Sequence, residues 1–128
     1  MNTEKKEALF SPDEENIANK TAELTELLCT TQDYKRYEKH LKALKEQPEK
    51  YHKLNEFRRK HMELQLEAED ERYYERMEAL YTEYKDILME SVVTKFLASE
   101  QSVCKMMRKI YDSIALKMNL DVTYMDET

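Results

Sequence analysis

The 128-residue sequence contains no glycine, no tryptophan and only two prolines. Glycine supplies the positive φ angles of tight hairpin turns and lets a backbone approach a bound phosphate closely. A sheet connected by tight turns is therefore not expected. The glycine-containing motifs of P-loop and dinucleotide-binding proteins are excluded.

Long apolar runs are missing as well. No stretch of apolar residues reaches the length of about 18 that a membrane span requires, so we expect no membrane insertion. The N-terminal segment lacks the apolar stretch of a signal peptide. Cys29 and Cys104 lie far apart and form no C-x-x-C motif, which predicts reduced thiols in a cytoplasmic protein.

Charge, in contrast, is abundant, since 38% of the residues are charged and the formal net charge is -6. Residues 33–61 hold ten basic and five acidic residues, a net charge of +5, so the other residues carry -11. The negative total argues against nucleic acid as the direct partner. The positive segment keeps an RNA-associated protein open as an alternative. Its possible basic surface consists of Lys35, Arg36, Lys39 and Lys42.

Apolar residues recur every three to four positions, which predicts four or five amphipathic helices. We expect the first to begin at a capping box over residues 11–14 and to end near Cys29. The second has Asp33 in its first turn and ends before Pro48, which opens the third. A break in the apolar rhythm predicts a bend near Asp70. The predicted fold class is all-α.

The last helix should be the longest, with Ser91 as its cap and its end near Asn119. Its apolar stripe is wide enough for more than one partner and comprises Val93, Phe96, Leu97, Val103, Cys104, Met107, Ile110, Tyr111 and Ile114. We therefore predict an antiparallel bundle with a long C-terminal helix: a frayed segment at 1–10, one helical domain at 11–119 and an acidic tail at 120–128. A bundle this thin often buries its remaining apolar surface by forming a homodimer or higher oligomer.

Few side chains suggest chemistry. Residues 49–52 form an E-x-x-H motif, but a ferritin-like metal site needs two such motifs and further carboxylates, so we interpret it as a solvated first turn. His61 lies on an apolar stripe and is interpreted as structural, and Cys104 as a small hydrophobe. We expect no catalytic residue and no metal site, although a metal-binding helical bundle is a second alternative.

Glu100 interrupts the apolar stripe of the last helix. A carboxylate at that position costs desolvation free energy unless a cation pairs with it. Arg58 or Arg59 is the expected partner, and the pair would fix the register of two helices.

Three patterns along the helices resemble a known family. The last helix carries Val92-Val93-x-x-Phe96-Leu97-Ala98-x-Glu100, followed by Met107-x-x-Ile110-Tyr111-x-x-Ile114. Earlier helices carry Ala22-Glu23-Leu24, Tyr34-x-x-Tyr37 and Glu56-Phe57-Arg58. Together these patterns, over roughly residues 17–120, are similar to the YlbF/YmcA family of bacterial helical regulatory proteins.

This resemblance implies an all-α fold that forms dimers or higher oligomers. It also implies a regulatory or adaptor role in Gram-positive bacteria, connected with competence, sporulation and biofilm control. Some members act in a complex that influences RNA processing through a membrane-tethered ribonuclease and is linked to iron–sulfur clusters. This sequence has no cysteine-rich tail, and Cys29 and Cys104 do not form a cluster-binding set, so no cofactor is expected.

The predicted function is therefore non-catalytic regulation through protein–protein interaction. The expected partners are a second copy of the chain and paralogous or regulatory proteins. The positions expected to have structural or interface roles are Glu56, Phe57, Arg58, Phe96, Glu100, Met107 and Tyr111.

Overall fold

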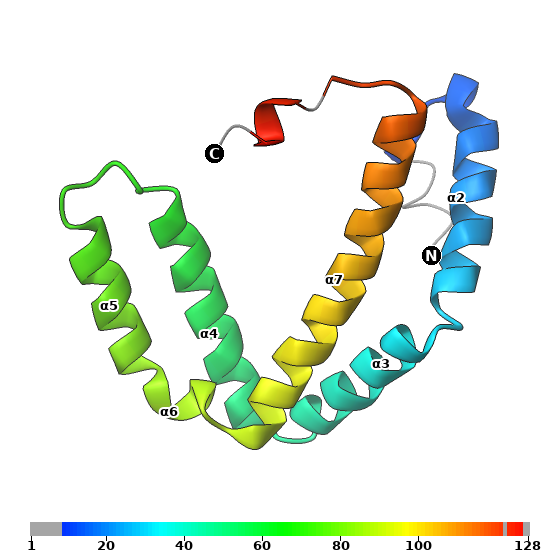
Figure 1. Cartoon of the computed structure of the whole chain (residues 1–128). Coiled ribbons are helices and arrows are strands. Elements are labelled where there is room, and N and C mark those ends of the chain that lie inside the picture. The colour runs from blue at the N-terminus through cyan, green and yellow to red at the C-terminus, as the bar shows by residue number, and fades with distance from the viewer. Residues whose placement is uncertain (1–8, 122, 127–128) are drawn as a thin grey trace. The chain divides into compact units, whose positions relative to one another are not determined.

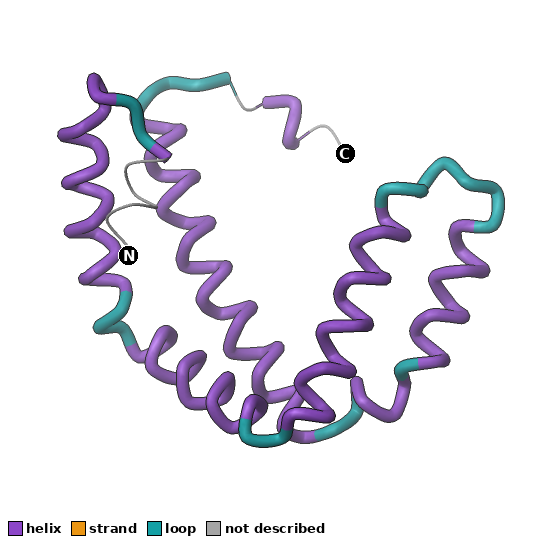
Figure 2. The backbone as a smooth tube through the Cα atoms, turned by 180° about the vertical axis from the view of Figure 1, so that it is seen from behind, coloured by secondary structure: helices purple, strands orange, loops and turns teal. Residues whose placement is uncertain are grey.

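The protein is all-α, as the sequence predicted. A computed structural model describes residues 9–121 and 123–126, and within these ranges every regular element is a helix and none is a strand (Figures 1 and 2). In chain order the elements are the 3₁₀ helix η1 (Pro12–Glu14), α2 (Glu15–Leu28), α3 (Gln32–Lys45), α4 (Pro48–Gln65), α5 (Tyr73–Glu83), α6 (Lys85–Leu88), α7 (Ser91–Lys117) and the 3₁₀ helix η2 (Thr123–Asp126). Residues 1–8 of the segment predicted to fray, and residues 122, 127 and 128 of the predicted tail, lie outside the described residues.

Contacts within the chain divide it into two compact units, residues 1–35 and 36–128. The first unit begins with the predicted capping box. Ser11 donates its hydroxyl to Glu14 Oε1 at 2.7 Å and its backbone N–H to the same oxygen at 3.1 Å. These two hydrogen bonds lower the pKa of the Glu14 carboxyl. α2 follows and ends at Leu28 with Cys29 as its C-cap, in agreement with the predicted end.

The second unit contains a helical hairpin in which α4 and α5 lie side by side (Figure 1). Pro48 opens α4 because its fixed φ suits the first helical turn. The predicted bend near Asp70 is confirmed as a turn over residues 66–72, where Asp70 Oδ1 accepts the backbone N–H of Arg72 at 2.8 Å. Arg76 of α5 forms ion pairs with Glu67 and Asp70, so opposite charges connect the turn to the start of α5.

The region before α7 differs from the prediction in two ways. Tyr84 separates α5 from α6 with a φ of -104° and a ψ of 14°, although the apolar stripe continues through this residue. Ser91 was predicted as the cap of the last helix, but it is the first helical residue. Glu90 is the N-cap because its backbone is extended, with a φ of -64° and a ψ of 134°. The other end of α7 agrees, since Asn119 adopts the left-handed conformation with a φ of 57°.

The core of the second unit joins the end of α3 to α4, α5, α6 and the start of α7. Its buried members are Leu44, Leu54, Phe57, Leu64, Leu80, Tyr84, Ile87, Val93 and Phe96. Along α7 this cluster reaches only to Phe96 and the half-buried Leu97. Cys104, which the sequence indicated to be a small hydrophobe of the apolar stripe, lies beyond this cluster and is exposed. The arrangement of all the helices as one antiparallel bundle stays a prediction.

Candidate functional site

Seven positions were expected to have structural or interface roles, and we call them the motif residues. Three of them, Arg58, Phe96 and Glu100, lie close together between α4 and α7. Arg58 Nη2 donates to both carboxylate oxygens of Glu100, each at 2.9 Å. The guanidinium carbon of Arg58 lies 5.8 Å from the ring centroid of Phe96. The carboxylate that interrupts the apolar stripe is thus compensated by Arg58, one of the two partners expected from the sequence. Because the side chains are 40% and 27% exposed, water still reaches this ion pair.

Phe57, a fourth motif residue, is the centre of an aromatic cluster between α4 and α5. Its ring centroid lies 5.5 Å from His61, 5.4 Å from Tyr81 and 5.5 Å from Tyr84. The Tyr81 hydroxyl is 3.1 Å from His61 Nε2, within hydrogen-bonding distance. His61 therefore has an aromatic setting and a polar partner, which agrees with the structural role that its place on the apolar stripe indicates.

Glu56, the fifth motif residue, lies near a lysine that also contacts α5. Lys60 Nζ is 3.9 Å from a carboxylate oxygen of Glu56 and 3.8 Å from one of Glu83. It also lies 5.1 Å from the ring centroid of Tyr84. A hydrogen bond with Tyr84 raises the pKa of Lys60, and Glu83 and Glu56 add to this effect against desolvation. A nucleophilic lysine needs a lowered pKa, so this environment is unsuited to that chemistry.

Met107 and Tyr111 lie away from the other motif residues, on the C-terminal half of α7. Together with Ile114 and Met118 they recur at intervals of four, three and four residues, which places all four on one side of the helix. Their exposed fractions are 56%, 53%, 50% and 62% in chain order. We call these four residues the α7 stripe. The predicted apolar stripe therefore continues along α7, but these residues in its second half are about half exposed.

The predicted basic residues Lys35, Arg36, Lys39 and Lys42 are all exposed on α3. The neighbouring tyrosines are not displayed with them, because Tyr37 is half-buried with its ring 5.7 Å from that of Phe96. Single-stranded nucleic acid binds best where exposed aromatic rings accompany basic groups. The arrangement on α3 offers charge without such rings.

The E-x-x-H motif opens α4 with both functional side chains exposed. Glu49 and His52 line a shallow depression whose other residues include the cations Lys53 and Arg59, which would repel a metal ion. Over residues 9–121 and 123–126, no group of three or more His, Cys, Asp or Glu side chains is placed to hold a metal. No helix in the same ranges combines the length and the apolar character needed to cross a bilayer.

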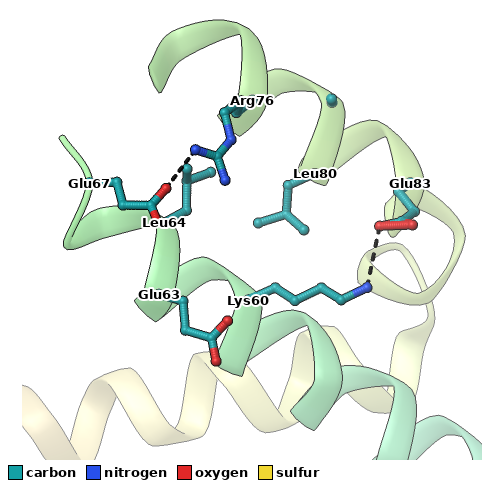
Figure 3. A pocket seen from close by; sticks show the side chains of 8 residues that line it. Lys60, Glu63, Leu64, Glu67, Arg76, Leu80 and Glu83 are labelled. Carbon is teal, nitrogen blue, oxygen red and sulfur yellow. Dashed lines mark hydrogen bonds and ion pairs between the residues drawn. The ribbon is translucent and has the colours of Figure 1, made fainter. Parts of the chain in front are cut away.

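A groove between α4 and α5 was missed by the sequence analysis (Figure 3). It encloses about 490 Å³ and has an apolar lining of Leu64, Ala79 and Leu80. The other lining residues are charged: Lys60, Glu63, Glu67, Arg76 and Glu83. Figure 3 shows two ion pairs across it, Arg76 with Glu67 and Lys60 with Glu83. The sequence signal was the acidic character of residues 63–83, but the groove exists only because α4 packs beside α5.

Comparison with known proteins yields one family. The sequence profile described as control of competence regulator ComK, YlbF/YmcA, matches residues 17–119. Neither the comparison with curated proteins nor the comparison with solved structures gives a match. The matched range includes the Arg58–Glu100 pair, the aromatic cluster around Phe57 and the whole α7 stripe.

Proposed function

The chain belongs to the YlbF/YmcA family, and we propose that it is a non-catalytic regulatory or adaptor protein that works by binding other proteins in the cytoplasm. The family is linked to control of the competence regulator ComK, which is a regulatory role. The first proposed partner is a second copy of the chain, giving a homodimer or higher oligomer. Paralogous or regulatory proteins are the proposed partners of that assembly.

The observation that carries this proposal is the exposed α7 stripe. Burying a whole side chain of this kind contributes about 1.5–3 kcal/mol. Each of the four is about half exposed, so covering the stripe would contribute about 1 kcal/mol for each side chain. Methionine and tyrosine are also enriched in protein interfaces, where flexible or amphipathic side chains adapt to a partner.

A second copy is the proposed occupant because a two-fold axis would place the same stripe on both sides of the contact. In this proposal Met107 and Tyr111 are interface residues. The remaining motif residues stabilise the fold that presents them: Glu56, Phe57, Arg58, Phe96 and Glu100. The proposal thus divides the family positions into a scaffold on α4 and the start of α7, and a contact surface farther along α7.

Multi-angle light scattering after size-exclusion chromatography tests this directly. At micromolar concentration the native chain should elute as a dimer or larger species. In about 500 mM sodium chloride, where contacts between surface charges are screened, the double variant Met107→Glu and Ile114→Glu should shift it toward the monomer, since each glutamate would have to be desolvated at the contact. Circular dichroism should report the same helix content, because both side chains are already exposed.

A matched control is available on other sides of α7. Gln101 and Ser113 are both exposed and lie outside the stripe, so Gln101→Glu with Ser113→Glu adds the same two negative charges. This control should keep the native mass. A native chain that is strictly monomeric, or a control that dissociates as much as the stripe variant, would refute the proposed contact.

A further inference from the structure

The end of α4, the turn that follows it and α5 form a strongly acidic segment. Residues 63–83 contain eight acidic residues and two arginines, a net charge of -6 that equals the net charge of the whole chain. On α5, the glutamates Glu75, Glu78 and Glu83 line a shallow depression of about 500 Å³ together with Ala79 and Thr82. Of its five lining residues none is basic. Glu75 and Glu78 are exposed, and neither forms an ion pair with another described residue.

Two exposed lysines lie on α3 at the same sequence spacing as Glu75 and Glu78. Lys39 and Lys42 are exposed, and within the described ranges neither forms an ion pair. They are three residues apart, as are Glu75 and Glu78, and three residues of helix rise by about 4.5 Å. Two ammonium groups and two carboxylates are therefore presented at the same spacing along two exposed helices.

We propose that α3 of one copy docks against α5 of a second copy, with Lys39 and Lys42 facing Glu75 and Glu78. The chain itself supplies both halves of the match, because α3 holds five basic and two acidic residues, a net charge of +3, and residues 63–83 carry -6. Ala79 and Thr82 are small enough to let a helix approach the lining of the depression. This contact uses residues separate from the α7 stripe and does not depend on it.

The contact joins two different surfaces, so it is heterologous. Such contacts either close into rings or continue into open chains, whereas contact through the α7 stripe would close at two copies. Two contacts on one chain would thus give assemblies larger than a dimer. They would also differ in their response to salt. Charge pairs at a solvated surface weaken as the screening length falls to about 3 Å at about 1 M salt, whereas apolar burial does not.

Sedimentation velocity of the full chain tests the proposal at about 50 mM and about 500 mM sodium chloride, which bracket physiological screening. The native chain should form species larger than a dimer at the lower concentration and lose them at the higher one. Lys39→Glu with Lys42→Glu should abolish the larger species at low salt. Glu75→Lys with Glu78→Lys should do the same, because each change makes the contact repulsive. The association constant should fall about tenfold or more for each pair.

The deciding measurement is an equal mixture of these two variants. Each variant keeps the surface that the other has lost, so the mixture should regain the larger species, with the two chains in equal amounts. The matched control for the lysine variant is Lys85→Glu with Lys95→Glu. It lowers the net charge by the same amount as Lys39→Glu with Lys42→Glu, at two other exposed lysines. It should behave as the native chain. Circular dichroism of each variant separates a lost contact from a lost fold.

Three results would overturn the proposal. The first is a native assembly whose size does not depend on salt, and the second is a mixture that fails to reassociate. The third is an RNA oligonucleotide that binds the native chain and not the lysine variant, with no larger protein species in either. Loss of the α7 contact alone would instead leave the salt-sensitive species in place, so the two proposals fail separately.

Discussion

Breaking the Arg58–Glu100 pair tests whether this contact holds α4 against α7. The perturbation is a double-mutant cycle made of Glu100→Gln, Arg58→Met and the two together. Glutamine keeps the size of the side chain and one acceptor, and methionine keeps much of the arginine stem over the Phe96 ring. The cycle therefore isolates the interaction between the charges from the packing around them.

The magnitude follows from geometry and exposure. Two unit charges about 4 Å apart attract by about 4 kcal/mol at an effective dielectric constant of about 20, but desolvation offsets most of this. Pairs in full contact with water contribute about 0–1 kcal/mol. Arg58 and Glu100 are 40% and 27% exposed and share two hydrogen bonds, so they fall at the upper end of that range. We expect a coupling free energy of about 1 kcal/mol.

Urea unfolding followed by circular dichroism at 222 nm measures this free energy. The control cycle uses Arg108 and Asp112, which pair at 3.2 Å on α7 with side chains more than half exposed. Because they are neighbours on one helix, their coupling should be only about 0.3–0.5 kcal/mol. A coupling for Arg58 and Glu100 within about 0.3 kcal/mol of zero would refute the reasoning, since the pair would then add nothing to stability.

Two further predictions concern the core and the N-terminal cap. Leu54→Ala should lower the free energy of unfolding by about 3 kcal/mol, because Leu54 is 1% exposed in the core. As the control, Leu66→Ala should change it by less than about 0.5 kcal/mol, because Leu66 is 84% exposed. Equal effects in urea unfolding would contradict the assigned core. Ser11→Ala should return the pKa of Glu14 toward 4.5, because both hydrogen bonds that lower it come from Ser11 and the alanine variant loses at least the hydroxyl. The Glu14 carboxylate stabilises the folded chain fully at pH values above 4.5, its ordinary pKa. This stabilisation is lost as the pH falls through the lowered pKa that Glu14 has in the folded chain. The native chain should thus have more helix than the Ser11→Ala variant at neutral pH, and the difference should disappear in acid. A Glu14 pKa that is the same in both proteins by NMR titration would contradict this prediction.

Local signals explain the helix boundaries that were predicted well. Pro48 cannot continue a helix from the residues before it but suits a first turn, and Asn119 tolerates the left-handed conformation at a helix end. These preferences act over a few residues and need no partner. Ser91 was wrongly predicted as a cap because capping depends on which residue has an extended backbone, and the chain placed that conformation at Glu90. The break between α5 and α6 at Tyr84 was not predicted, because no Gly or Pro lies near it.

The candidate site was only partly predictable for a related reason. The position of Glu100 within an apolar stripe predicted a cation partner, and Arg58 provides it. The same periodicity could not distinguish the buried Val93 from the exposed Met107, because both occupy one stripe on one helix. Periodicity states which side of a helix is apolar, whereas burial depends on where a second helix reaches it.

The sequence by itself determined that the chain is helical, where most helices begin and end, and which side of each is apolar, because these properties arise from neighbours within a turn or two. It also determined the separation of positive residues 33–61 from negative residues 63–83. Only the tertiary structure decided that the hydrophobic cluster of the second unit reaches along α7 no farther than Leu97, that a groove lies between α4 and α5, and that the four residues of the α7 stripe are about half exposed. Those outcomes require contacts between residues far apart in the chain, and a one-dimensional pattern does not contain them.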